Sequence, residues 1–403
     1  MEEDELGFSY PTVDFSQCVG CDCCERACPV ISTRTVPTDR LPGACIAWTT
    51  RGEDLSAATS GGVFTAVARN VLDRGGVVVG AAYGDDLVVR HVAVESLSHL
   101  HKLSRSKYVQ SDMGNVFEEV EGYLRVGREV LFSGTPCQAY AIQAYCRAMR
   151  IDVSRLMVVD VVCHGTPMPK LLREYLAWQG DKHGSPVVNL SMRGRDLPGH
   201  YGTGTYIQVD FADGQHYKAD TGTDPFGYFF FGGFSARPSC YQCPFKVLNH
   251  ATDLTLGDCW FSRCITERED VPFEVTLCFS HTKKGQILLN SNCDLECVDV
   301  DVLNAVKCNG GMLYSSGVPN QDRDEFLSEL GSGSFESIVA RRIPTEGDSS
   351  MLQRLVKTVK SSVKALIPER LLALRWLRAQ DKEYGRRMHR VIPESAFAIQ
   401  RIE

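Results

Sequence analysis

Apolar runs and helical spacings alternate through the middle of the chain. The runs VVVGAAY at 77–83, EVLFSG at 129–134 and LMVVDVV at 156–162 are typical of buried strands. Apolar residues at helical spacing predict helices over 60–76, 113–125, 139–146 and 169–178. Strands that alternate with helices of this length favour a mostly parallel sheet covered on both faces. The sequence therefore predicts an α/β fold for a main body at 45–340.

Two other segments differ from this pattern. Residues 187–233 contain short apolar stretches separated by glycine turns, which predicts an antiparallel insertion next to the functional site. Residues 1–44 hold a cysteine-rich arm and the proline-rich exit TVPTDRLPG, which is typical of a linker. We predict that 1–44 form a small ferredoxin-like half-module, and that 341–403 form a separate helical tail.

The predicted tail is amphipathic and basic. From Arg341 onward its net charge is +7, while the first 340 residues carry −14. Between 350 and 366 six apolar residues share one helical stripe: Leu352, Leu355, Val356, Val359, Val363 and Leu366. Three roles stay open for 350–390: a helix packed on the body, a contact with a partner, or attachment to an anionic membrane surface. Because the main body is acidic, we expect no nucleic-acid partner.

Composition points to a protein that needs no covalent cross-links. With 403 residues the chain can bury a sizeable core, and no apolar run reaches the roughly 20 residues that span a bilayer. The acidic start MEEDELGFSY lacks the pattern of a signal peptide, so we expect a cytoplasmic protein. Seventeen cysteines in such a protein indicate metal or cluster ligation, because disulfides are rare in a reducing compartment.

The arm carries the clearest motif. Cys18, Cys21, Cys24 and Cys28 follow C-x2-C-x2-C-x3-C-P, the spacing of bacterial ferredoxins, which predicts a [4Fe-4S] cluster rather than zinc. In ferredoxins with two such runs, the fourth cysteine of each run ligates the other cluster. Cys28 therefore either closes the cluster of its own run or belongs to another cluster. Cys23 adds a further thiol within the loop.

A second set of cysteines lies in the body. Cys137 and Cys163 each follow a predicted strand, and a C-x2-C pair lies at Cys240 and Cys243. Because the carboxyl ends of parallel strands meet at one edge of a sheet, these four thiols could bind a second cluster. The alternative is a catalytic thiol at Cys137 with a structural pair. Eight others fit small core residues: Cys45, Cys146, Cys259, Cys264, Cys278, Cys293, Cys297 and Cys308.

Two further features have open interpretations. His164 follows Cys163 and could donate to a flavin or an anion, or be an ordinary loop residue. Gly61 and Gly62 open a predicted helix after Ser60, where backbone N–H groups could hold a phosphate. No G-x-G-x-x-G follows a predicted strand, so an ordinary Rossmann dinucleotide site is not supported.

Six stretches, in this order, resemble the beta subunit family of coenzyme F420 hydrogenase/dehydrogenase, in its stand-alone bacterial form with an N-terminal ferredoxin segment. They are ATSGGVFTAVA at 58, SRSKYVQS at 104, VLFSGTPCQ at 130, VDVVCHGTP at 159, RPSCYQCPFK at 237 and DLTLGDCWF at 253. The resemblance covers about 7–290. GFSYPTVD resembles the stretch that joins two cysteine arms in relatives, so we expect a first arm to be lost or to lie upstream.

The resemblance implies an FAD-containing iron-sulfur oxidoreductase. It places the flavin against a phosphate turn at Thr59, Ser60, Gly61 and Gly62, a Ser-Lys-Tyr motif at Ser106, Lys107 and Tyr108, and loops at Thr135, Pro136 and His164. Lys107 would favour the reduced flavin anion or the pyrophosphate. Lys107 and His164 are the candidate catalytic residues. Cys137, Cys163, Cys240 and Cys243 match cysteines of the family, which favours one or two clusters in total.

The expected function is therefore electron transfer between [4Fe-4S] clusters, supplied by a ferredoxin-like carrier or a partner subunit, and a small organic substrate at FAD. The flavin handles one-electron and two-electron steps, whereas a cluster handles one electron at a time. Two alternatives remain: an electron-transfer subunit that docks a separate catalytic partner, and a zinc-stapled binding protein without a redox role. The substrate is not identified by the sequence.

Overall fold

The computed structural model of the chain describes residues 1–31, 41–195, 205–260, 262–272, 274–309, 313 and 316–343. The predicted amphipathic helix and the proposed contact at 350–390 lie outside these residues, as does most of the predicted linker. Within the described ranges, no helix is long and apolar enough to cross a membrane.

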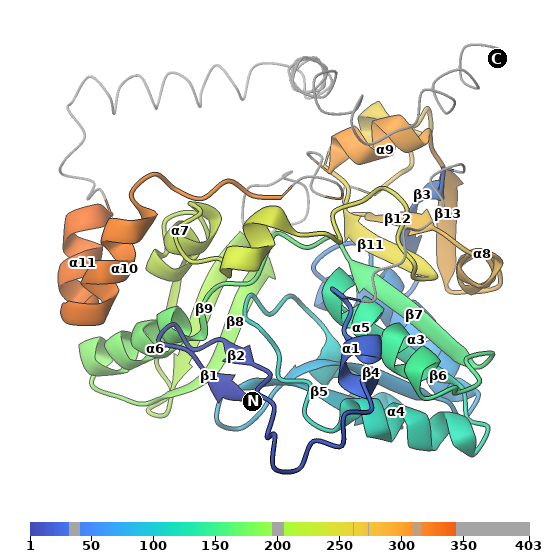
Figure 1. Cartoon of the computed structure of the whole chain (residues 1–403). Helices are drawn as coiled ribbons and strands as arrows, with labels where there is room; N and C mark the ends of the chain where they lie inside the picture. The colour runs from blue at the N-terminus through green and yellow to red at the C-terminus, as the bar shows by residue number, and fades with distance from the viewer. Residues whose placement is uncertain are drawn as a thin grey trace.

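An eight-stranded mixed sheet forms the centre of the molecule (Figure 1). Its four middle strands run parallel to one another, and antiparallel strands flank them on both sides. This confirms the predicted α/β class, and the three predicted strands are middle strands. The spatial order is β13 (Leu295–Asp299), β3 (Gly43–Thr49), β12 (Thr276–Ser280), β11 (Leu254–Asp258), β7 (Leu156–Val161), β6 (Val130–Gly134), β4 (Val77–Tyr83) and β5 (Val89–Val94).

Helices cover both faces of this sheet. Within β6, Leu131 packs with α3 (Val63–Asp73), the 3-10 helix η1 (Leu97–Leu103) and α8 (Lys283–Asn290). The adjacent Val130 and Phe132 face the other way, toward α4 (Val116–Arg125) and α5 (Pro136–Ala148). Successive side chains of a strand point to opposite faces, so an apolar run is buried on both sides. Near β3, α9 (Val302–Cys308) closes a third cluster.

A second layer contains the predicted antiparallel insertion. Its three strands are β8 (Val187–Arg195), β9 (Thr205–Phe211) and β10 (His216–Asp220). They share an apolar core with the helices α6 (Pro169–His183), α7 (Pro225–Phe231), α10 (Arg323–Ser332) and α11 (Phe335–Arg342). The insertion is confirmed, but α7 was not expected there. Its N-terminus is capped by Asp224, whose carboxylate accepts from the backbone N–H groups of Phe226 and Gly227.

The N-terminal residues pack against this second layer. Strands β1 (Glu2–Glu3) and β2 (Ser9–Tyr10) form a hairpin, and the Phe8 side chain between them is 0% exposed. Arg237 secures the hairpin by donating to Ser9 O (3.2 Å) and by stacking over the Tyr10 ring at 4.4 Å. The cysteine arm follows, with the short helix α1 (Cys23–Ala27) beside α5 (Figure 1). The segment 1–10 thus contributes to the core of the body, whereas the arm lies at its surface.

Candidate functional site

Three parallel strands bring the predicted site residues to one edge. β6, β7 and β11 are neighbours, so their carboxyl ends lie side by side. Thr135 follows β6, Cys163 and His164 lie just beyond β7, and Asp258 is the last residue of β11. The order of parallel strands therefore explains why segments more than a hundred residues apart meet here.

The four predicted body thiols come together at this edge. Cys137 lies in the first turn of α5, and Cys163 follows β7. Cys240 lies in the 3-10 helix η2 (Pro238–Gln242), and Cys243 directly follows that helix. Although solvent reaches the side chain of Cys137, reduced hydration among the surrounding protein atoms raises the pKa of this thiol to about 12, and the other three thiols add to this rise through their charges. Burial also raises the pKa of Cys240 to about 11. The four thiols therefore influence one another electrostatically.

Hydrogen-bond donors and a cation surround these thiols. The backbone N–H of Gly165 donates to Cys163 Sγ at 3.3 Å, and Thr135 Oγ1 lies 3.1 Å from Cys137 Sγ. Lys246 donates to the carbonyl of Cys163, and its charge acts on Cys163, Cys240 and Cys243. Gly165 has φ of +108°, and a Cβ there would lie 3.3 Å from Cys240 Cβ. Four thiols with a nearby cation suit the charge of a thiolate-bound cluster.

This arrangement differs from a site for one metal ion. Across the described residues, no group of three or more His, Cys, Asp or Glu side chains could hold a single ion. A four-iron cluster places its thiolates on separate irons, so its ligands are spread farther apart than those of one zinc ion. Five of the eight cysteines expected in the core are buried there: Cys45, Cys146, Cys259, Cys278 and Cys308.

The arm thiols lie apart from the body set. Cys18, Cys21 and Cys24 are exposed, and Cys28 is partly exposed. Because α5 has 13 residues, it is about 20 Å long. The contact between α5 and α1 therefore places α1 within about 20 Å of Cys137, which lies in the first turn of α5.

The loop 104–108 contains the predicted Ser-Lys-Tyr motif. Lys107 Nζ donates to the carbonyls of Ser104 (2.7 Å) and Lys102 (3.1 Å), which ties the loop to the end of η1. Burial, with a smaller effect of Arg105, lowers the pKa of Lys107 to about 7. Arg105 has φ of +67°, a strained value for a residue with a side chain. Its Nε donates to Ala57 O at 3.2 Å, which connects this loop to the turn containing Thr59.

Tyr108 leads from this loop to a buried ion pair. Its hydroxyl hydrogen-bonds to Arg193 and Ser106, and Arg193 pairs with Asp258 at 2.6 Å. Burial raises the pKa of Tyr108 above its usual range. Arg193 was not identified from the sequence. Arg193 follows Met192 on β8, where neighbouring positions alternate between buried and partly buried. An unpaired charge in such a strand would be costly, and this was the available signal.

His164 lies on the other side of the same group. Its ring meets the Phe231 ring edge-on with centroids 6.0 Å apart, and Phe231 also contacts Tyr108 at 5.3 Å. Burial and the charge of Lys246 lower the pKa of His164 to about 4, although solvent reaches its side chain. The imidazole is therefore neutral near pH 7, with one nitrogen able to donate and the other to accept.

A hydrogen-bonded chain links Thr135 to His91 of β5. Thr135 caps α5 with Gln138 in a capping box, and Gln138 Nε2 donates to Ser111 Oγ at 2.8 Å. Ser111 Oγ lies 2.9 Å from His91 Nδ1. The charge of Lys107 contributes to lowering the pKa of His91. α5 begins at Pro136, three residues before the predicted start, so Cys137 lies on a helix rather than in a loop.

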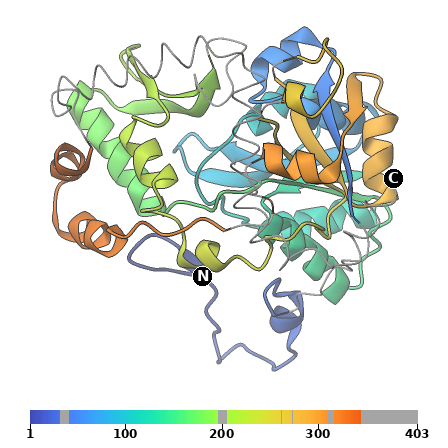
Figure 2. The same cartoon turned by 90° about the horizontal axis from the view of Figure 1, so that it is seen from above.

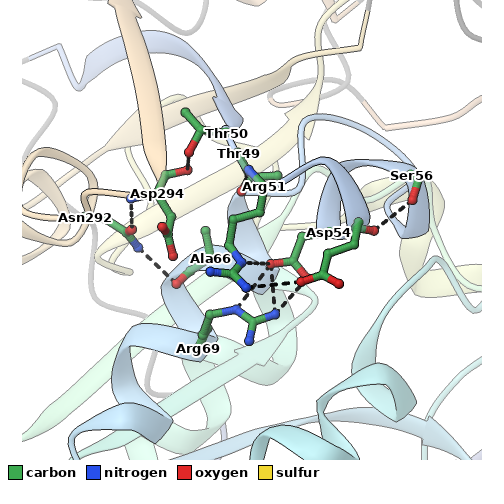
Figure 3. A network of polar contacts seen from close by, with 10 residues as sticks. Thr49, Thr50, Arg51, Asp54, Ser56, Ala66, Arg69, Asn292 and Asp294 are labelled. Atoms are coloured by element: carbon green, nitrogen blue, oxygen red, sulfur yellow. Dashed lines mark hydrogen bonds and ion pairs between the residues drawn. The ribbon is translucent and has the colours of Figure 1, made fainter.

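Ion pairs join the helices before and after the glycine turn at 59–62 (Figure 3). Arg69 of α3 binds the buried Asp54 of α2 (Gly52–Ala57) with two nitrogens, at 2.8 and 3.2 Å. Asp54 in turn contacts Arg51, so the two helices around the turn are fixed to each other. Gly62 has φ of +74° and begins α3, whose N-terminus has no side-chain cap. An uncapped helix N-terminus can accept a phosphate group.

Gly61 is needed for a close contact between backbones, whatever binds at the turn. A Cβ at Gly61 would lie 2.6 Å from Thr276 N and still closer to Ala47 O. We expect Gly61→Ala to lower the free energy of unfolding by about 3 kcal/mol, because neither strand can move away without breaking the sheet. Urea unfolding would measure the loss. Gly52→Ala is the control, since nothing lies within 4 Å of a Cβ there; equal stability of the two variants would contradict the explanation.

The structure connects parts of the predicted body site. Arg105 bonds to Ala57 O, two residues before Thr59, Tyr108 joins the Arg193–Asp258 pair, and the charges of the four thiols act on one another. The structure does not bring the arm thiols into this set. Of the added residues, Arg193 and Phe231 were missed by sequence reasoning.

Among the curated proteins, no match to this chain was found. Among solved structures, the chain is similar to one in the F420-reducing [NiFe] hydrogenase complex from Methanosarcina barkeri, with 17% identity and a TM-score of 0.45. That similarity covers 68% of this chain and 90% of the other.

A family model that describes the C terminus of the coenzyme F420 hydrogenase/dehydrogenase beta subunit matches residues 127–304. The matched segment contains β6, β7 and β11, the insertion and all four body thiols. This family comprises oxidoreductases with a role in electron transfer. Residues 127–304 are therefore similar to the C-terminal part of the coenzyme F420 hydrogenase/dehydrogenase beta subunit.

Proposed function

We propose that the chain is an iron-sulfur flavoprotein oxidoreductase that passes electrons between [4Fe-4S] clusters and an organic hydride donor or acceptor at FAD. The observation that carries the proposal is the convergence of Cys137, Cys163, Cys240 and Cys243 beside the Tyr108–Arg193–Asp258 group. A cluster supplies single electrons, whereas a flavin joins one-electron and two-electron steps.

The residues of the body divide into two sets by chemistry. The four thiols, with Lys246 to offset their negative charge, would hold the cluster. The turn at Thr59, Ser60, Gly61 and Gly62 would hold the pyrophosphate at the uncapped N-terminus of α3. Arg105 keeps this turn next to the Lys107 loop through its bond to Ala57 O.

Three side chains would orient the flavin ring and the substrate. Tyr108 and Phe231 offer aromatic surface, and His164 offers one nitrogen as donor and one as acceptor. Arg193 is a positioning residue, because its ion pair with Asp258 and its bond to Tyr108 fix the ring of that tyrosine. Electrons would arrive from a ferredoxin-like carrier or a partner subunit through the arm, whose helix α1 contacts α5.

Anaerobic purification with counts of iron, sulfide, zinc and flavin per chain tests the proposal. We expect iron and sulfide in equal amounts, about one flavin per chain, and reduction of that flavin when a reduced ferredoxin is added. A colourless protein that contains zinc and no flavin would overturn it. A protein with iron but no flavin would restrict the chain to electron transfer for a separate catalytic partner.

A further inference from the structure

Asp224 is a buried carboxylate at the start of the helix that carries Phe231. Its side chain is 0% exposed. One carboxylate oxygen accepts from the backbone N–H groups of Phe226 (2.8 Å) and Gly227 (3.3 Å) in the first turn of α7. The other accepts from the Tyr175 hydroxyl at 2.8 Å. Burying a charge is costly even where hydrogen bonds compensate part of the lost hydration.

Two tyrosines from neighbouring elements bond to this carboxylate. Tyr175 lies on α6 and Tyr217 on β10. Burial raises the pKa of both phenols above their usual range, so both keep their protons and can donate. Gln179 of α6 donates to the Tyr175 hydroxyl at 3.1 Å, and the His183 ring lies 5.9 Å from the Tyr217 ring. The carboxylate thus joins α7 to two other elements of the second layer.

The far end of α7 forms part of the candidate site. Phe231 is the last residue of the helix, and its ring contacts those of Tyr108 (5.3 Å) and His164 (6.0 Å). Figure 2 shows α7 beside α6, on the side of the second layer that faces the main sheet. Because α7 has seven residues, it is only about 10 Å long, so loss of its first turn removes support from Phe231.

We propose that Asp224 is a positioning residue: its buried carboxyl group holds α7, and with it the Phe231 ring, in place in the candidate site, and this hold weakens when the carboxyl group loses its proton. Opening of α7 allows water to hydrate the carboxylate, so the charged form favours opening and the neutral form favours the closed helix. The opening of α7 does not depend on what binds beside Phe231. Only its role in admitting a ligand rests on the proposed function.

The pKa of Asp224 sets the pH range of this effect. Burial raises it to about 6, although the bonds from Tyr175 and from the α7 backbone act in the opposite direction. In the opened helix the hydrated group has its ordinary value of 3.8. Between these pH values the closed helix binds one more proton than the opened one, so closure weakens as the pH rises and stays constant above pH 6. The opening constant should therefore increase about tenfold from pH 5 to pH 7.

Hydrogen exchange of the full chain between pH 5 and 8, corrected for the intrinsic rate of each amide, measures this opening. In the wild type, exchange at Phe226, Gly227 and Phe231 should accelerate about tenfold from pH 5 to pH 7. Asp224→Asn keeps an acceptor for the backbone N–H groups and carries no charge at any pH. Its exchange in α7 should be independent of pH and, at pH 7, at least ~10-fold slower than in the wild type.

Two further variants identify the group that titrates. Asp301→Asn is the matched control, because Asp301 also caps a seven-residue helix, α9, but is exposed. It should leave the pH dependence of exchange in α7 unchanged. Tyr175→Phe removes one donor to the carboxylate, so the upper end of the pH dependence should move above 6.

Two results would overturn the inference. The first is exchange in α7 that does not change with pH in the wild type, or that keeps the wild-type profile in Asp224→Asn. The second is a pH dependence confined to Phe226 and Gly227, because Phe231 would then not move with the helix. All of these measurements are made without FAD, so they decide the role of Asp224 whether or not the flavin binds where we propose.

Discussion

Replacing Cys240 and Cys243 together with serine is expected to remove about four irons per chain while the protein stays folded. Cys240 lies in the short helix η2, and Cys243 directly follows it. Both side chains are only partly buried, so serine leaves no large cavity. A serine hydroxyl does not replace a thiolate as a ligand for iron. Loss of the cluster should slow the reduction of the flavin by a ferredoxin by at least ~100-fold, because the proposed path of electrons to the flavin passes through this cluster.

Iron and sulfide counts, with electron paramagnetic resonance of the reduced protein, would measure this loss. Cys293→Ser is the control, because Cys293 is exposed and lies outside the site. Iron that stays at the wild-type level would refute ligation by Cys240 and Cys243. It would favour the other interpretation of the sequence, in which Cys137 is a catalytic thiol and the pair is structural.

The convergence of the body thiols could be predicted because it depends on strand order. The runs that became β6 and β7 are mostly apolar, with Ser133 and Asp160 as their polar members, so both could be recognised as strands. Two parallel strands joined by a helix place both carboxyl ends at one edge, so Cys137 and Cys163 follow from local patterns. Cys240 and Cys243 were linked to them only by chemistry and by the resemblance, since no strand leads to η2 directly.

The start of α5 was missed although the sequence contains the signal. Thr135 and Gln138 are spaced as a capping box, and Pro136 occupies the first helical position, where proline is favoured. Apolar spacing alone placed the start at 139. A helix that begins at Pro136 directs the thiol of Cys137 from a rigid first turn, which is why the thiol can be held 3.1 Å from Thr135 Oγ1.

Long-range pairs account for what the sequence could not show. Arg193 and Asp258 lie 65 positions apart on different sheets, and only the packing of the insertion on the main sheet brings them together. Phe8 is a similar case, because the short alternation of Leu6, Phe8 and Tyr10 does not show which part of the chain covers Phe8. Its burial depends on α6 and on the stacking of Arg237 over the hairpin, both far away in the chain.

Replacing Lys107 with methionine is expected to remove a pH dependence from the stability of the protein. The pKa of Lys107 is lowered to about 7 by burial, whereas in the unfolded chain it has the ordinary value of 10.5. Between these pH values the unfolded state binds one more proton, so the free energy of unfolding rises with pH, by about 1.4 kcal/mol per unit from this group. Below pH 7 both states are protonated and the contribution is constant.

Urea unfolding between pH 6 and 10 measures the slope, and the difference between wild type and variant isolates Lys107 from other groups. Lys102→Met is the matched control, because this exposed lysine lies in the same loop region. The control should keep the wild-type slope. If Lys107→Met also kept it, the lysine would be charged in the folded protein throughout this range.

The same titration should govern the binding of FAD, if the flavin lies where we propose. Protonated Lys107 attracts the pyrophosphate and neutral Lys107 does not, so the wild-type Kd for FAD should increase as the pH rises through about 7. In Lys107→Met the Kd should be about tenfold higher at pH 6 and should not change with pH, which corresponds to about 1.4 kcal/mol of lost attraction. A variant that retains the wild-type dependence on pH would separate Lys107 from the flavin, while its stability slope would still report the burial of the lysine.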